Sequence, residues 1–230
     1  MRTRDPDGLS PLRLFYGPLA PPPTDLFAFF VWEVVSTRTL PARRDITWQA
    51  LRRLPALTPD AMFRASKDDL EAALVAVGSV EQRSDALKDG SGHFRRHRDL
   101  ADRVRGPLLG AARVLARVPH LTPSARTRAL LWTGGHLIAP VDDALARTLA
   151  RLHGLATGPK ARVRRMARRH LCAAVAGERE KLADAVVVLA HHATHACADV
   201  PHCTVCPLAA NCRHAQRSAV SPSTGSGLVE

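Results

Sequence analysis

Apolar residues recur at helical spacing along most of the chain. Phe27, Phe30, Val31 and Val34 lie at i, i+3, i+4 and i+7, which predicts a helix that starts at a Thr24 cap. Similar apolar stripes predict helices over residues 66–77, about 107–118, 122–134, 142–152, 161–175 and about 178–195. No segment alternates convincingly as a strand does, and no Asn-Gly hairpin turn is present. The predicted fold class is all-α.

Capping residues mark the boundaries of several of these helices. Thr58-Pro59 and Thr122-Pro123 each place an N-cap before a proline at the first helical position. Ser66 followed by Asp69 resembles a capping box, and Gly78 is expected to stop that helix. These signals predict where three of the helices start and where one of them ends.

The two ends of the chain differ from the helical part. Residues 1–23 are rich in proline, and residues 215–230 in serine, glycine and threonine, so we expect a disordered arm and a flexible tail. The start lacks the apolar core of a signal peptide, and the apolar runs at 26–35 and 183–190 are shorter than the roughly 20 residues that span a bilayer. We therefore expect a soluble, cytoplasmic protein with no membrane partner.

Charge favours a polyanionic partner. Lys and Arg number 33 against 21 Asp and Glu, which gives a net charge of +12, and only four of the basic residues are Lys. The planar guanidinium of Arg pairs well with phosphate oxygens, so nucleic acid is the first expectation. The alternative is that an Arg-rich composition reflects no particular partner.

Four of the five cysteines fall within sixteen residues near the C-terminal end. The spacing is Cys197-x5-Cys203-x2-Cys206-x5-Cys212, whereas Cys172 stands alone in a predicted helix as a core residue. Clustered thiolates in a reducing compartment indicate a soft-metal site rather than disulfides. An iron–sulfur cluster is favoured, and zinc is the rival because His202 and His214 lie nearby.

This cysteine loop, with Cys206-Pro207-Leu208 and a closing Cys212, resembles that of the endonuclease III and adenine glycosylase family of helix-hairpin-helix DNA glycosylases. The resemblance implies a [4Fe-4S] cluster held by Cys197, Cys203, Cys206 and Cys212. The first gap is five residues here and six in the family. His192 matches a family histidine in the helix that leads into the cluster.

Residues 118–142 carry a second and independent match. They read VPHLTPSARTRALLWTGGHLIAPVD, and the family pattern is L-P-G-V-G-R-K-T-A, a helix, then V-D, with the same length. His120 and Thr122 stand where the family has the two glycines that let DNA approach the hairpin turn. A helix N-terminus after such a turn suits a phosphate, whatever the base sequence. An ordinary helical turn is the alternative.

Asp142 aligns with the catalytic carboxylate of the family. Cleavage of the base–sugar bond builds positive charge on the deoxyribose, which a carboxylate can stabilise while it orients a water. On the residues alone, Asp142 or Asp143 could equally cap a helix.

Three further positions follow from the resemblance. Ser124 stands where endonuclease III carries its Schiff-base lysine, and a serine cannot form that imine, so weak or absent lyase activity is expected. Glu33 begins EVVSTRT, which is similar to the E-V-x-x-Q-Q-T of adenine glycosylases, whose Glu acts as an acid near the flipped base; a surface Glu is the alternative. Arg38 or Thr39 would fill the gap that the flipped base leaves.

The resemblance implies a two-domain protein that flanks a DNA cleft. Residues 24–39 with 151–214 would form the cluster domain, and residues 40–150 the central domain, with the hairpin at about 107–135. The expected activity is hydrolytic removal of a damaged or mismatched base from double-stranded DNA, by a nucleoid-associated monomer using Asp142 and Glu33, with His120, Thr122, Ser124 and Arg38 at the DNA. The alternatives are a catalytically inactive DNA-binding paralogue and a bifunctional lyase that uses a distant lysine.

Overall fold

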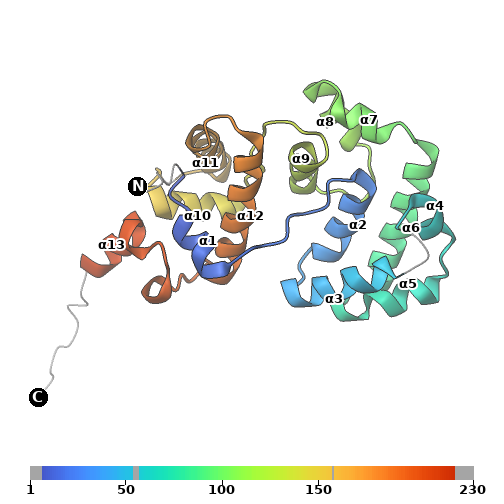
Figure 1. Ribbon diagram of the computed structural model, residues 1–230, viewed down its shortest axis with the longest axis horizontal. Coiled ribbons are helices and arrows are strands. Elements are labelled where there is room, and N and C mark those ends of the chain that lie inside the picture. The colour runs from blue at the N-terminus through green and yellow to red at the C-terminus, as the bar shows by residue number, and fades with distance from the viewer. Residues whose placement is uncertain (1–6, 54–56, 157, 221–230) are drawn as a thin grey trace, which may run out of the picture. The chain divides into compact units, whose positions relative to one another are not determined.

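In the computed structural model, residues 7–53, 57–156 and 158–220 are described (Figure 1). These residues form helices joined by short connections and contain no strand, which confirms the all-α prediction. None of their helices is long and apolar enough to cross a bilayer. By their contacts the residues divide into two compact units, one made of residues 22–138 and the other of residues 7–21 with 139–220.

The described residues of the unit 22–138 form eight α-helices and one 3-10 turn. Their bounds are α2 Leu26–Ser36, α3 Pro41–Arg52, α4 Pro59–Arg64, α5 Lys67–Leu74, η1 Val75–Val77, α6 Val80–Arg96, α7 Leu100–Arg105, α8 Leu108–Leu115 and α9 Pro123–Trp132. Helix α2 is buried over nearly its whole length and packs against α3, α6 and α9. Because α2 is apolar on all sides, it forms the core of this unit.

Helix α6 lies unusually close to α2. A Cβ at Gly90 would stand 2.1 Å from Cζ of Phe30, so only glycine fits there. Phe94, one turn further along α6, packs with its ring centroid 5.2 Å from that of Phe27. The sequence did not predict α3, α6 or α7, and α6 buries Gly90, Ser91 and Gly92, which carry no hydrophobic signal.

The other unit contains the helices α1 Ser10–Tyr16, α10 Asp143–His153, α11 Lys160–Ala174, α12 Arg179–His195 and α13 Arg213–Val220, with 3-10 turns η2 Cys203–Val205 and η3 Ala209–Asn211. Helix α10 packs against α11, α12 and α13, and α1 packs against α12. The predicted bounds of α10, α11 and α12 are accurate to within one residue.

Three of the predicted N-caps are confirmed, and a fourth lies one residue later than predicted. Thr58, Ser66 and Thr122 each accept a hydrogen bond from a backbone N–H three residues on, at 3.2, 3.0 and 3.2 Å. The predicted cap at Thr24 is wrong by one position, because Asp25 accepts from the N–H of Ala28 at 2.8 Å. Gly78 follows η1 with a φ of 69°, as a stop requires.

The ends of the chain and the domain division differ from the sequence prediction. Residues 10–16 form α1, because Pro11 stands in the first turn, where a missing N–H costs nothing, and Leu12 is fully buried. Residues 1–6 of the expected arm and 221–230 of the expected tail lie outside the described residues, while α13 continues to Val220. The apolar packing of α2 groups residues 24–39 with the hairpin rather than with residues 151–214.

Candidate active site and cysteine loop

Helices α8 and α9 and the turn between them form a helical hairpin at the position predicted for the motif. Val118 and Leu121 of the turn are buried, which fixes the turn against the unit of residues 22–138. His120 adopts a φ of 59°, a left-handed conformation that glycine takes most easily and histidine tolerates. Nε2 of His120 lies 3.0 Å from Oδ2 of Asp89 on α6. The backbone therefore keeps a glycine-like geometry at the position where the family pattern has a glycine.

The start of α9 presents a polar edge. Proline at position 123 has no N–H, and Thr122 takes the N–H of Ala125. Ser124 lies in the first turn, and its Oγ accepts from Nη1 of Arg128 at 3.1 Å. The described hairpin thus offers side-chain hydroxyls and a cation rather than the bare backbone of two glycines.

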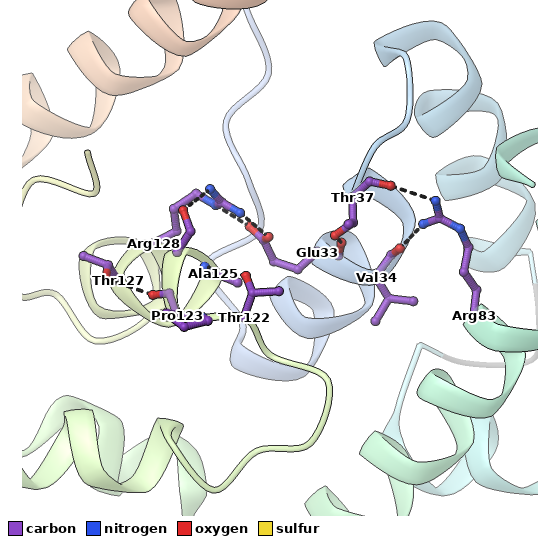
Figure 2. A network of polar contacts seen from close by, with 10 residues as sticks. Glu33, Val34, Thr37, Arg83, Thr122, Pro123, Ala125, Thr127 and Arg128 are labelled. Atoms are coloured by element: carbon purple, nitrogen blue, oxygen red, sulfur yellow. Dashed lines mark hydrogen bonds and ion pairs between the residues drawn. The ribbon is translucent and has the colours of Figure 1, made fainter. Parts of the chain in front are cut away.

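Glu33 lies buried on α2, with 6% of its surface exposed. Its carboxylate accepts two hydrogen bonds from Arg128 of α9, Nε to Oε1 at 2.7 Å and Nη2 to Oε2 at 2.6 Å (Figure 2). Such a fork-to-fork pair is among the strongest that proteins make. Both carboxylate oxygens of Glu33 are therefore engaged as acceptors by the same guanidinium. Sequence reasoning missed Arg128, although its position four residues after Ser124 places the two on one helix face.

The turn after α2 is held by Arg83 of α6. Its guanidinium donates to the carbonyls of Val34 and Thr37, the latter at 2.7 Å (Figure 2). It also donates to Oγ1 of Thr39 at 3.0 Å. These bonds satisfy carbonyls that the helix end leaves open. Arg38 lies in this turn with a φ of 53° and an exposed side chain.

Asp142 and Asp143 have different surroundings. Oδ1 of Asp142 accepts the N–H of Leu145 at 2.9 Å, so Asp142 caps α10, and among the described residues it makes no ion pair. Asp143 pairs with Arg164 at 2.6 Å and Lys160 at 3.4 Å. Burial alone would raise the pKa of Asp143, but the hydrogen bond and charge of Arg164, with those of Lys160, outweigh it and lower that pKa. The cap and the salt bridges are thus divided between the two carboxylates.

The cysteine loop follows α12 and surrounds one pocket. Cys197, Cys203, Cys206 and Cys212 all line it, together with His192 and Arg151. Within the described residues, no three His, Cys, Asp or Glu side chains are arranged as a formed metal site. The four thiols therefore share a cavity, and the chemistry of the donor set fits a soft metal.

Arg151 of α10 holds the first part of this loop. It donates to the carbonyls of Cys197, Ala198 and Asp199 at 3.2, 2.5 and 2.9 Å, and its Nη1 lies 3.6 Å from Sγ of Cys197. On the other side, Nε2 of His192 lies 3.7 Å from Sγ of Cys206, and Nδ1 of His192 lies 2.9 Å from the Tyr16 hydroxyl. Burial is the main cause that raises the pKa of the Cys203 and Cys206 thiols.

Comparison with solved structures identifies the fold. A trapped covalent complex of endonuclease III with DNA, in an estranged-adenine complex, matches at a TM-score of 0.67 with 15% identity, over 93% of this chain and 95% of that one. The chain has the endonuclease III fold. A non-covalent endonuclease III–DNA complex gives a TM-score of 0.68 over the same shares at 15% identity. A thermostable thymine-DNA glycosylase gives 0.66, at 15% identity over 91% of this chain and 95% of that one.

Comparison by sequence finds no match, whereas comparison by structure does. No family model matches the chain, and no curated protein matches it in sequence. The predicted helix-hairpin-helix glycosylase fold is confirmed, and at 15% identity it is the fold alone that the likeness shows. The functional assignments of individual residues rest on the geometry described above.

Proposed function

We propose that this protein is a DNA glycosylase of base excision repair that hydrolyses the N-glycosidic bond of a damaged or mismatched nucleotide in double-stranded DNA. The observation that carries the proposal is Asp142, a carboxylate at the start of α10 that makes no ion pair with the described residues, in a chain with the endonuclease III fold. Positive charge develops on the deoxyribose as the base leaves, and Asp142 would stabilise that charge and orient the attacking water.

The hairpin would bind the DNA backbone. The polar edge at His120, Thr122 and Ser124 can donate to phosphate oxygens, and such contacts position the duplex whatever its sequence. Arg38, exposed in the turn that Arg83 fixes, would enter the space left by the turned-out nucleotide.

Glu33 would hold Arg128 and α9 in place rather than donate a proton, because both its oxygens accept from Arg128. In the expected activity, Glu33→Gln lowers the rate of excision but leaves the shape of its pH profile unchanged. If the rate of excision by the variant no longer falls on one side of the pH optimum, Glu33 acts as a proton donor after all.

The lysines favour a monofunctional enzyme. A Schiff base needs a free neutral amine. Lys67, Lys160 and Lys181 each pair with a carboxylate. Burial lowers the pKa of Lys88, which favours its neutral amine, but its nitrogen is held by hydrogen bonds to the carbonyls of Phe63 and Ala65. Each lysine of the chain is therefore engaged, which argues against the bifunctional alternative.

The four loop cysteines would hold a [4Fe-4S] cluster, which when bound would tie the loop of η2 and η3 to the end of α12. Arg151 and His192 would orient the loop around it through the contacts described above. Zinc on the same thiolates is the competing assignment.

Asp142→Asn tests the proposed function. Asparagine caps a helix about as well as aspartate, so the variant should fold while losing the charge. We expect the wild type to release a base from at least one member of a lesion panel, and the variant to lose at least about 100-fold in single-turnover rate. Asp143→Asn is the matched control, because Asp143 already pairs with Arg164 and Lys160, and it should retain activity. Duplex binding without release of any base by the wild type would favour the inactive paralogue.

A further inference from the structure

Helix α11 carries a row of cations on its outer face. Over residues 160–174 the helix contains five Arg and one Lys and no acidic residue. Arg162, Arg165 and Arg169 are exposed, and among the described residues none of the three forms an ion pair. At about 100° per residue, these three lie within about 60° of one another around the helix axis. We call them the α11 stripe.

The stripe lies opposite the side by which α11 packs. Ala167 and Leu171 are buried, and the helix contacts α10 through that side. Arg164 and Arg168 also have partners in and before α10: Arg164 pairs with Asp143, and Nε of Arg168 donates to the carbonyl of Ala139, in the segment before α10, at 3.0 Å. The inner arginines thus have structural partners, whereas the outer three point to solvent.

Nothing in the helix offsets the repulsion within the stripe. Like charges at i, i+3 and i, i+4 destabilise a helix, and surface helices commonly interleave acids to avoid this. Arg162, Arg165 and Arg169 have these spacings without an acidic neighbour in the helix. A polyanion laid along the helix would remove the repulsion and pair with the free guanidinium groups.

A basic hollow continues the stripe beyond the N-terminal end of α11. It lies between α10, α11 and α13 and is lined by Arg147, Arg151, His214 and Arg217, with Val163 of α11 on one wall and no acidic side chain. Arg217 is exposed. In this hollow Arg147 pairs with Asp199 at 2.7 Å and Arg151 donates to loop carbonyls, so Arg217 is the arginine of the hollow that adds a cation to those of the stripe within the same compact unit.

We propose that the α11 stripe is a second duplex-binding surface, separate from the hairpin, which holds the phosphates of undamaged DNA without reading its sequence. The stripe spans about 10 Å along α11, and duplex DNA carries one negative charge per about 1.7 Å of its axis, so three phosphates fall within reach of three guanidinium groups. The proposal rests on the proposed function only in the choice of DNA as the polyanion. Binding of this kind would raise the time spent on DNA between lesions.

The test compares two triple variants with equal loss of charge. Arg162→Gln, Arg165→Gln and Arg169→Gln are combined in one protein, and Gln keeps the helix propensity of Arg. Arg43→Gln, Arg52→Gln and Arg53→Gln are the matched control, exposed residues on or directly after α3, which contacts neither α8 nor α9 to any appreciable extent. Both proteins are checked for helix content and unfolding midpoint before binding is measured.

Affinity for an undamaged duplex is measured by fluorescence anisotropy across salt concentrations. Removing three phosphate contacts should lower the slope of log K against log salt by about 2.7, so that between about 50 and 200 mM salt the wild type loses about 40-fold more affinity than the stripe variant does. The control should keep the wild-type slope. A stripe variant with the wild-type slope, or a control that loses as much, would overturn the proposal.

Two further measurements separate the outcomes. If the stripe variant binds duplex normally but loses binding to vesicles of anionic phospholipid or to a polyglutamate peptide, the surface serves that partner and the proposal is wrong. Single-turnover excision from a short lesion duplex at saturating protein should be unchanged in the stripe variant. A wild type that excises nothing would end the proposed glycosylase function and leave the stripe supported, provided that its slope falls as expected.

Discussion

Arg128 on α9 donates two parallel hydrogen bonds, of 2.7 and 2.6 Å, to the carboxylate of Glu33 on α2. This ion pair links the hairpin to the most apolar helix of its unit. The side chain of Glu33 is 7% exposed and that of Arg128 is 28% exposed. Removing either partner would leave the other charge largely shielded from water.

We therefore expect strong energetic coupling between these two residues. In a double-mutant cycle of Glu33→Gln and Arg128→Gln, the coupling free energy should be about 1–3 kcal/mol by urea unfolding. The exposed pair of Asp102 and Arg105, at 3.4 Å, is the control and should couple by less than about 0.5 kcal/mol. Equal coupling in the two cycles would contradict the structural role of the buried pair.

The contact between α2 and α6 predicts opposite effects for two glycine substitutions. Gly90→Ala places a Cβ 2.1 Å from Phe30 and should lower the free energy of unfolding by about 1–3 kcal/mol, despite the better helix propensity of alanine. Gly110→Ala on α8 meets nothing within 4 Å and should raise that free energy by up to about 1 kcal/mol. Unfolding midpoints of both variants give the comparison, and a stabilised Gly90→Ala would show that α6 does not pack closely on Phe30.

We expect the iron–sulfur cluster to depend on the four loop cysteines and not on the fifth cysteine of the chain. Protein purified without oxygen should be brown, with iron and sulfide in equal amounts, and Cys203→Ser should lose both. Cys172→Ser on α11 is the control and should keep them, because Cys172 does not line the pocket. A colourless protein with one zinc ion per chain would establish the competing assignment.

Histidine burial predicts a loss of stability in mild acid. Burial, and then the charges of His170 and Arg213, lower the pKa of His153 from 6.5 to about 4, and the ring centroids of His153 and His170 are 3.9 Å apart. The folded state then binds fewer protons than the unfolded state, so this contribution to stability is complete above about pH 6.5 and is lost as the pH falls toward 4.

Urea midpoints at several pH values measure this dependence. His153→Gln should flatten it between pH 6.5 and 4, whereas His170→Gln should flatten it less, because burial is the larger cause of the shift. An unchanged acid slope in His153→Gln would place the responsible group elsewhere.

The engaged lysines predict the absence of strand cleavage. Incubation with abasic duplex and borohydride should trap no covalent adduct on the wild-type protein, because Ser124 cannot form an imine and each lysine has a partner. An adduct that disappears in one Lys→Arg variant would identify a distant nucleophile and establish the bifunctional alternative.

The helices predicted from the sequence are mostly those with an apolar stripe, and a side-chain cap marks the start of several of them. Thr58, Ser66 and Thr122 cap as predicted because a hydroxyl three residues before an N–H needs no tertiary partner. Helix α6 was not predicted because, besides Leu87 and Phe94, most of its buried residues are small, and one of them, Gly90, lies directly against the ring of Phe30. A cap can be predicted from one short segment of sequence, whereas the fit between two helices depends on both helices and cannot be predicted from either alone.

The candidate site shows the same division. The cysteine spacing predicts that four thiols lie close together, and the hairpin length predicts that Asp142 stands at the start of a helix, because both depend on short stretches of chain. The pairing of Glu33 with Arg128, 95 residues apart, requires the fold to bring α2 and α9 together. The motif resemblance that suggested a proton donor at Glu33 covers residues 33–39 only, so it gave no information about Arg128.

His120 has a wider consequence. Its left-handed φ of 59°, held between a buried Val118 and a buried Leu121, shows that the hairpin turn is shaped by what surrounds it and not by the residue at its apex. A sequence motif that requires glycine at this position does not match this chain. A structural motif that instead requires a left-handed φ at this position does match it, and a search by backbone dihedral angles can find other chains that have this turn without glycine.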